Sequence, residues 1–169
     1  MGMRRRTTRT RSAEDVYSSL APAVLGYFRA HRLPDPEGLT GDVFVSVARR
    51  LPTFEGDDDA LRRWVFTIAH NRGVDEVRRR ARRPDAVGLD GVDVAAPVPD
   101  DGLDPALVQA LAALTEDQRE IVVLRHVADL SVADVARTTG RSEGSVKMLC
   151  ARALEALAAQ LAVTTPDRP

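Results

Sequence analysis

Apolar residues in the first half of the chain recur at helical spacing. Three segments carry such a stripe, with apolar positions three or four residues apart: Ala13–Ala30, Leu39–Leu51 and Ala60–Arg83. Ser12 stands directly before the first of them, as a helix-capping residue does. In the third segment the apolar positions before and after Gly73 fall on different faces, so either the helix bends there or different partners cover its two parts. No stretch alternates with a period of two, which predicts a half without strands.

The second half is predicted to form four more helices. Their apolar patterns run over about 106–113, 116–127, 131–138 and 142–161. Thr115, followed three residues later by Gln118, has the pattern of a capping box. Short loops between short helices are typical of a compact bundle. We therefore predict an all-α fold with two small helical domains, over residues 12–83 and 106–162.

A segment rich in proline, glycine and aspartate separates the two halves. Residues 84–105 hold six Asp and no Lys or Arg, whereas residues 1–83 hold 17 Lys or Arg against 11 Asp or Glu. We predict a flexible acidic linker with a relaxed span of roughly 25 Å and a stretched reach of roughly 75 Å. We also predict a disordered basic tail over residues 1–11 and a C-terminal tail over residues 163–169.

Composition narrows the class of protein. The chain has 169 residues, a net charge of −1 and a single cysteine, which excludes a disulfide scaffold and favours a reducing compartment. No apolar run reaches the roughly 18–20 residues of a membrane span. The basic N-terminus is not followed by the apolar stretch of a secretory signal. The expectation is a cytoplasmic protein without membrane insertion.

Residues 132–149 have the spacing of a helix-turn-helix. A small residue, Ala136, stands where the two helices touch, Gly140 permits a left-handed backbone, and Val146 anchors the second helix in the core. The alternative is a plain helical hairpin with a glycine cap. Helical geometry buries the stripe of Val146, Leu149, Cys150 and Ala153. The opposite side, which faces a major groove in this kind of motif, carries Ser145, Lys147, Met148, Ala151 and Arg152.

The third helix of the first half ends in a run of arginines. Six Arg lie between residues 72 and 83, with Trp64 and Phe66 just upstream. Arginines beside aromatic surfaces suit a single-stranded or distorted nucleic acid. The alternative is that the aromatic rings belong to the core and the arginines form a solvated helix end. Asn71, the only asparagine in the chain, lies in the middle of the predicted helix. Its amide is able to bind a base edge, and the alternative is that it is an exposed neutral residue without such a role.

Sequence patterns of catalysis and metal binding are missing. The chain has no phosphate-binding glycine loop with a lysine and no GxSxG, HExxH or CxxC, so we expect neither an enzyme nor a cofactor nor a small-molecule substrate. The histidines at 31, 70 and 126 lack the spacing of metal ligands, and no metal site is expected. We interpret Cys150 as a small buried apolar residue, and the acidic cluster at 57–59 as a helix cap or a solvated loop rather than a cation site.

Two segments resemble the sigma-70 family of bacterial RNA polymerase initiation factors, in its short extracytoplasmic-function (ECF) group. The first is similar to sigma region 2 and reads DPEGLTGDVFVSVARRLPTF…LRRWVFTIAHNRGVDEVRRR. The second is similar to sigma region 4 and reads LTEDQREIVVLRHVADLSVADVARTTGRSEGSVKMLCARALEAL. Together they cover about two thirds of the chain, in the order of the family. The resemblance implies core RNA polymerase and promoter DNA as partners, and it leaves an inhibitory anti-sigma factor open.

The resemblance also implies roles for individual residues. In the family, region 2 binds the polymerase clamp and opens the minus-ten element, and region 4 reads the minus-thirty-five element. The positions that match the clamp-binding part are Glu37, Leu39, Asp42 and Phe44. The positions that match the minus-ten reader are Trp64, His70, Asn71, Arg72, Arg78 and Arg79. The positions that match the minus-thirty-five reader are Ser142, Ser145, Lys147, Met148, Ala151 and Arg152.

The chain departs from the family at four of its positions. An acidic residue is usual where Gly38 stands, and Gln is usual where Gly41 stands. Ser-Arg is frequent where Met148 and Leu149 stand. The departures affect the clamp-binding helix and the helix that reads the upstream element.

Three functions are compared on these grounds. The first is a dissociable polymerase subunit. A nearly neutral chain binds duplex DNA weakly, so useful affinity needs two tethered contacts acting together. The two DNA sites are two helical turns, or roughly 70 Å, apart. The second is a stand-alone repressor whose first half dimerises or binds a ligand, and it predicts DNA binding without polymerase. The third is an RNA-binding protein, and it predicts RNA binding that survives deletion of residues 106–169.

Overall fold

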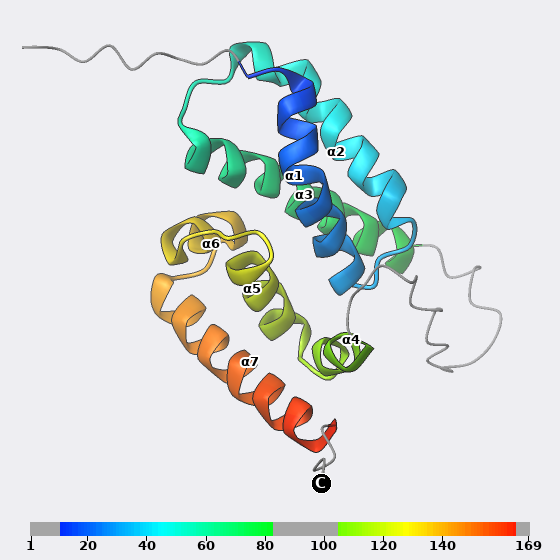
Figure 1. Ribbon diagram of the computed structural model, residues 1–169, viewed down its shortest axis with the longest axis vertical. Helices are drawn as coiled ribbons and strands as arrows, with labels where there is room; N and C mark the ends of the chain where they lie inside the picture. The colour runs from blue at the N-terminus through cyan, green and yellow to red at the C-terminus, as the bar shows by residue number, and fades with distance from the viewer. Residues whose placement is uncertain (1–10, 83–104, 165–169) are drawn as a thin grey trace, which may run out of the picture.

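The computed structural model describes residues 11–82 and 105–164, and within these residues the chain is all-helical (Figure 1). The first half contains α1 (Ala13–Ala30), α2 (Pro36–Arg50), the short 3-10 helix η1 (Leu51–Thr53) and α3 (Asp58–Ala81). The second half contains α4 (Pro105–Ala112), α5 (Glu116–His126), α6 (Val132–Thr139) and α7 (Glu143–Thr164). The all-α prediction is confirmed, and each expected helix lies close to its expected place.

Side chains cap the helices where the sequence predicts caps. The Ser12 hydroxyl accepts a hydrogen bond from the Asp15 backbone N–H at 3.0 Å, and the Asp15 carboxylate accepts one from the Ser12 N–H at 3.3 Å. A second capping box joins Thr115 and Gln118 at the start of α5. Asp57 caps α3 through its carboxylate, so this member of the acidic cluster is a helix cap.

Three predicted segments lie almost wholly outside the described residues: the tail over 1–11, the linker over 84–105 and the tail over 163–169. Arg11 belongs to the first of them and is described. Its guanidinium pairs with Asp58 and donates to the carbonyl oxygen of Gly56. The acidic start of α3 therefore holds the side chain at the last residue of the predicted tail, and residues 1–10 lie outside the described part of the chain.

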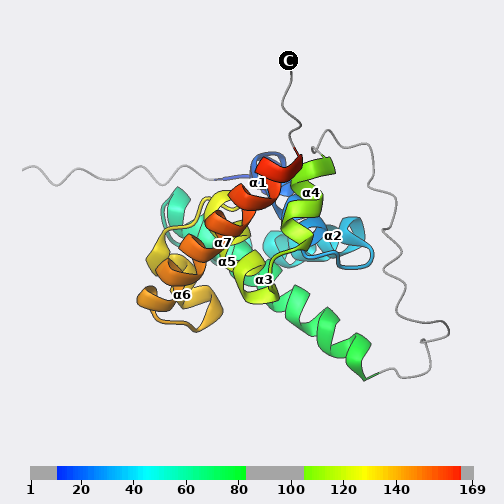
Figure 2. The ribbon, with the colours of Figure 1, turned by 90° about the horizontal axis from the view of Figure 1, so that it is seen from below.

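α3 changes surroundings along its length. Before Gly73 it packs against α1 and α2, and Val65, Phe66 and Ala69 are fully buried. Beyond Gly73 the helix projects from the rest of the molecule (Figure 2), and Val77 is 45% exposed. The helix is continuous through Gly73. The shift of its apolar face therefore reflects different surroundings and not an interruption of the helix.

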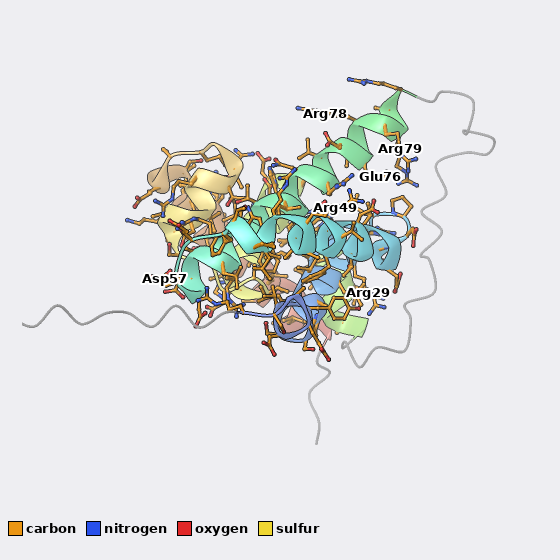
Figure 3. All side chains as sticks on the ribbon, turned by 90° about the horizontal axis from the view of Figure 1, so that it is seen from above. Arg29, Arg49, Asp57, Glu76, Arg78 and Arg79 are labelled. Carbon is orange, nitrogen blue, oxygen red and sulfur yellow. The ribbon has the colours of Figure 1, made fainter. Side chains whose placement is uncertain are left out.

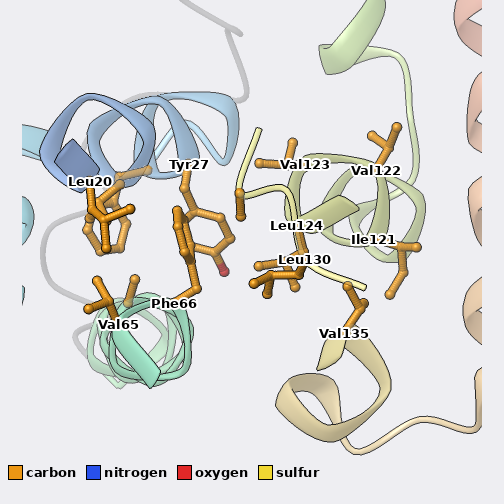
Figure 4. Close-up of a cluster of buried hydrophobic side chains, with 14 of the residues drawn as sticks. Leu20, Tyr27, Val65, Phe66, Ile121, Val122, Val123, Leu124, Leu130 and Val135 are labelled. Atoms are coloured by element: carbon orange, nitrogen blue, oxygen red, sulfur yellow. The ribbon is translucent and has the colours of Figure 1, made fainter. Parts of the chain in front are cut away.

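The two halves pack against each other. α1 contacts α4 and α5, and α3 contacts α6. Figure 4 shows Tyr27 and Phe66 of the first half on the side that faces Leu124 and Leu130 of the second, and all four are buried in one apolar cluster. Nothing in the sequence predicts this contact, because a relaxed linker of roughly 25 Å permits the halves to touch or to separate.

Candidate nucleic-acid interface

α6, a tight turn and α7 form the predicted helix-turn-helix. The Ser131 hydroxyl caps α6, and the helix ends at Gly140, whose φ of 70° is the left-handed conformation that the turn requires. Ala136 is buried on α6, and Val146 is fully buried on α7, which packs against α6. The Ser142 hydroxyl accepts the Ser145 backbone N–H at 3.2 Å at the start of α7. The spacing of the small, glycine and aliphatic positions is confirmed in three dimensions.

The outer side of α7 presents a mixed basic and apolar surface. Four of the predicted DNA-facing residues along this helix are exposed: Lys147, Met148, Ala151 and Arg152. Ser142 is exposed at the start of the helix, whereas Ser145 is half-buried. On the inner side Ala153 is fully buried with Val146, while Leu149 and Cys150 are only half-buried. The predicted division of α7 into two faces is therefore correct, with Leu149 and Cys150 at the border.

The projecting end of α3 is strongly basic. Figure 3 shows Arg78 and Arg79 on this end, and both are exposed. Glu76 is buried and pairs with Arg79 at 2.7 Å. Asn71 and Arg72 lie nearer the middle of α3 and are exposed as well, with the Arg72 guanidinium 3.5 Å from the Ser46 hydroxyl of α2. Asn71, Arg72 and Arg78 are thus exposed, while the guanidinium of Arg79 neutralises the buried Glu76.

Two of the predicted minus-ten residues are less exposed than the arginines: Trp64 is half-buried and His70 is largely covered. The Trp64 ring stacks on Phe54, with 4.9 Å between centroids and 24° between planes, and is half-buried. His70 faces α5, where its Nδ1 lies 2.9 Å from the Glu120 Oε1, and the two side chains are only 13% and 17% exposed. The two atoms lie within ion-pair distance, and the imidazole carries a charge there only when it is protonated. His70 is therefore inaccessible to DNA while the halves are in contact.

The predicted polymerase-binding residues lie on α2 with different exposure. Glu37 and Asp42 are exposed, and Leu39 is half-buried. A hydrogen bond from the Arg29 guanidinium at 2.6 Å lowers the pKa of Glu37. Phe44 is 7% exposed. The expectation that Phe44 offers its side chain to polymerase is corrected here, because its ring belongs to the core and supports α2 from inside.

The cap at the start of α2 explains why residue 38 is a glycine. Asp35 caps α2 in a left-handed conformation with φ of 51°, and its carboxylate accepts the Gly38 backbone N–H at 2.9 Å. A Cβ on residue 38 overlaps the carboxylate oxygen Oδ2 of Asp35. A side chain at this position therefore has to displace the cap.

Polar contacts between α3 and the second half were not predicted. The Arg63 guanidinium pairs with the Asp134 carboxylate at 2.9 Å. The hydroxyl oxygens of Thr67 and Thr138 lie 3.4 Å apart. Arg62 donates to a backbone carbonyl in the turn after α5. No signal in the sequence marks these pairs, because their members are more than 60 residues apart and follow no local spacing.

Asp134 is the most strongly held charge of this contact. Burial disfavours its ionised form, but hydrogen bonds from Ser131, Arg63 and Arg137 outweigh burial and lower its pKa from 3.8 to about 2. The carboxylate also lies in the first turn of α6, where the helix dipole favours negative charge. Asp134 therefore stays ionised and joins the cap of the helix-turn-helix to α3.

Two further groups between the halves have shifted pKa values. Burial opposes the ionisation of Glu120, yet the neighbouring His70 lowers the pKa of Glu120 below its ordinary value. Burial lowers the pKa of His31 to about 4. At neutral pH the contact therefore holds an ionised Glu120 and an uncharged His31.

The described part of the chain shows no arrangement for a metal ion. Within it, no three His, Cys, Asp or Glu side chains come together as ligands. Cys150 is a free, half-buried thiol. Its Sγ lies 3.8 Å from the His126 Nε2, and this pair is one of the contacts between α5 and α7. None of the described helices combines the length and the apolar character that crossing a bilayer requires.

Comparison with known proteins matches both halves to one family. Residues 16–83 match Sigma-70 region 2, and residues 105–157 match Sigma-70, region 4. The ECF RNA polymerase sigma factor BldN of Streptomyces coelicolor is 34% identical over 139 residues, which span 78% of this chain and 53% of BldN. The ECF RNA polymerase sigma factor ShbA of Streptomyces griseus is 31% identical over 166 residues, which span 88% of this chain and 86% of ShbA.

A solved structure agrees with the fold. The sigma factor RpoE of Bartonella quintana, crystallised with the anti-sigma factor NepR, aligns with a TM-score of 0.70 and 27% identity, over 92% of this chain and 98% of RpoE. Sigma factors regulate transcription and are not enzymes, so the expectation of a non-enzymatic protein is confirmed by the family. On these matches, the chain belongs to the sigma-70 family of RNA polymerase sigma factors, in the ECF group.

Proposed function

We propose that the chain binds core RNA polymerase and directs it to promoters, with α3 at the minus-ten element and α7 at the minus-thirty-five element. One observation carries this proposal: a single chain joins a projecting arginine-rich helix to a helix-turn-helix with an exposed basic face. The first suits distorted or single-stranded DNA, and the second suits a major groove. Membership of the sigma-70 family supports the pairing of the two.

The minus-ten contact is proposed for the exposed side of α3. Arg72, Arg78 and Arg79 bind phosphates, and the Asn71 amide both donates to and accepts from a base edge. The Trp64 ring, already stacked on Phe54, offers an aromatic surface to an unstacked base. Melting of the duplex follows from this preference for separated strands.

The minus-thirty-five contact is proposed for the outer side of α7. Lys147 and Arg152 reach phosphates or guanine edges, while Met148 and Ala151 make apolar contacts such as those with a thymine methyl. Ser142 and Ser145 contribute hydroxyl groups at the start of the helix, where backbone N–H groups favour a phosphate. Met148 replaces a polar residue frequent in the family, so the upstream element differs in sequence from that of most relatives.

Three partners follow from this proposal. Core polymerase binds α2 through the exposed Glu37 and Asp42, with Leu39 beside them. Promoter DNA is the second partner. An anti-sigma factor is the third, by analogy with RpoE, which was crystallised with NepR. The place of action is the cytoplasm, where a bacterial polymerase works.

Run-off transcription tests the proposal. The purified chain is added to core polymerase from a Streptomyces, the genus of two relatives, and transcripts are mapped on a promoter library. Asn71→Ala lowers open-complex formation with little change in closed-complex affinity. Lys147→Ala lowers affinity for the upstream element and reduces the salt slope of binding by about one. Arg11→Ala removes a charge outside the proposed DNA-binding surfaces of α3 and α7. It leaves open-complex formation and the affinity for the upstream element unchanged.

Two results contradict the proposal. The first is specific duplex binding by the chain alone that core polymerase does not strengthen, which is the behaviour of a repressor. The second is binding to single-stranded RNA that persists after deletion of residues 106–169.

A further inference from the structure

The buried side of α3 ends in a charged residue. Its buried positions run from Leu61 through Ala69 and Gly73 to Glu76, which lies about one turn beyond Gly73. The earlier members of this stripe are apolar or glycine, whereas Glu76 carries a carboxylate on a side chain that is only 8% exposed. A buried carboxylate is costly unless a group of opposite charge accompanies it. Glu76 therefore needs a cation at the point where α3 leaves the core.

Arg79 supplies this cation from three residues further along the same helix (Figure 3). Its Nε donates a hydrogen bond to the Glu76 Oε2 at 2.8 Å, and its Nη2 lies 2.7 Å from the same oxygen. Despite this contact, the Arg79 side chain is 64% exposed. A guanidinium has five N–H groups, so a pair made through Nε and Nη2 leaves the two N–H groups of Nη1 for a further acceptor.

The neighbouring Arg78 is exposed without such a hold. Within the described part of the chain, no carboxylate forms an ion pair with the Arg78 guanidinium. A side chain of this kind meets a phosphate as a mobile charge, whereas a guanidinium that is already held in place loses less freedom on binding. The two arginines therefore differ: Arg78 adds a net positive charge, and Arg79 is a fixed donor within a neutral pair.

We propose that Glu76 is a positioning residue for promoter binding: it holds the Arg79 guanidinium in place, so that Arg79 meets a DNA phosphate as a directed hydrogen-bond donor within a neutral ion pair. This inference rests on the proposed function, in which the end of α3 binds the minus-ten element. Because the pair is neutral, Arg79 adds little to the salt dependence of binding, although its hydrogen bonds add affinity. The alternative is a pair that only stabilises the end of the helix.

The salt dependence of promoter binding tests the inference. Holoenzyme is assembled from the chain and core polymerase, and its affinity for a fluorescent promoter fragment with an unpaired minus-ten segment is measured at several salt concentrations. Each phosphate neutralised by a cationic side chain contributes about 0.7–0.9 to the slope of log affinity against log salt concentration. We expect Arg78→Gln to lower this slope by about that amount, and Arg79→Gln to lower it by less than about half as much.

Removal of the carboxylate is expected to have the opposite effect. Glu76→Gln keeps the size of the side chain and removes its charge, so the Arg79 charge is no longer compensated and the slope rises by about 0.7–0.9. In the Arg79→Gln background the same substitution has less than about half of this effect, because no guanidinium is left to release. The matched control is Asp75→Asn, which removes an exposed acid from the same turn and acts equally in both backgrounds.

A second pair of variants tests the fixed geometry of the guanidinium. Arg79→Lys keeps the positive charge but replaces the planar fork by a single ammonium group, which is unable to hold a carboxylate and a phosphate in the same arrangement. We expect a loss of affinity for the promoter fragment of roughly fivefold or more. The matched control, Arg78→Lys, retains its mobile charge and changes the affinity by less than roughly twofold.

Four outcomes overturn the inference. The first three are equal slopes for Arg78→Gln and Arg79→Gln, a Glu76→Gln effect that is the same with and without Arg79, and equal losses for the two lysine variants. The fourth is weaker binding by Glu76→Gln together with lost helix content in circular dichroism, which assigns the pair to helix stability alone. A different result tells against the proposed function itself: a holoenzyme whose affinity and slope are unaffected by Arg78→Gln.

Discussion

Replacing Asp134 by Asn removes the charge that joins the helix-turn-helix to α3. The carboxylate lies 2.6 Å from the Ser131 hydroxyl, 2.9 Å from Arg63 and 2.6 Å from Arg137, and the side chain is 12% exposed. Its pKa falls from 3.8 to about 2 on folding. At 1.36 kcal/mol per pKa unit, the ionised form stabilises the folded chain by about 2 kcal/mol more than the protonated form does.

The pH dependence of this contribution has a definite sign. Because folding lowers the pKa of Asp134, its ionised carboxylate stabilises the folded chain at pH values above the pKa of an aspartate in the unfolded chain, about 3.9. This stabilisation is lost as the pH falls through the folded-state pKa of about 2. Urea unfolding followed by circular dichroism gives the free energy of unfolding of the wild type and of Asp134→Asn. We expect a difference of about 2 kcal/mol between pH 5 and 7 that shrinks below pH 4.

The matched control is Asp58→Asn. Asp58 pairs with Arg11, but its side chain is 89% exposed. Surface pairs of this kind contribute at most about 1 kcal/mol, so the control changes stability little at any pH. The reasoning is refuted if Asp134→Asn costs no more than Asp58→Asn at pH 7, or if its cost is the same at pH 6 and pH 3.

Three further predictions concern the stability of single elements. Gly140→Ala places a side chain at a φ of 70° and costs about 1 kcal/mol in urea unfolding; an unchanged midpoint contradicts the assigned turn. Phe66→Ala empties a fully buried site and costs about 3–5 kcal/mol, and a thermal melt that stays within a few degrees of the wild type refutes the burial. Thr115→Ala removes the hydroxyl of the capping box and costs about 1 kcal/mol, visible as faster amide hydrogen exchange in the first turn of α5; equal exchange tells against the cap.

Local chemistry explains what the sequence predicted well. Ser12 and Thr115 begin helices because a short hydroxyl side chain satisfies a free backbone N–H, a rule that involves only three neighbouring residues. Gly140 marks the turn because few other residues adopt its backbone conformation. The two faces of α7 follow from helical spacing once Val146 is recognised as the buried anchor. Each of these inferences needs only a few consecutive residues.

Long-range packing explains what the sequence did not predict. The resemblance assigned Phe44 to polymerase binding, whereas its place beside the apolar stripe of α2 agrees with its burial, at 7% exposed against 51% for the neighbouring Val45. His70 was predicted to face DNA, and its cover, Glu120, is 50 residues away. The pair of Arg63 and Asp134 depends on how the two halves of the chain pack against each other, which no periodicity within either half records.

The most direct test of the central claim is promoter binding measured with and without core polymerase. A fluorescent promoter fragment is titrated with the wild-type chain alone, with core polymerase alone and with both. We expect weak binding that depends strongly on salt in the first two titrations, and tight, promoter-specific binding with strand opening only in the third. Tight and specific binding by the isolated chain, unaffected by core polymerase, contradicts the account.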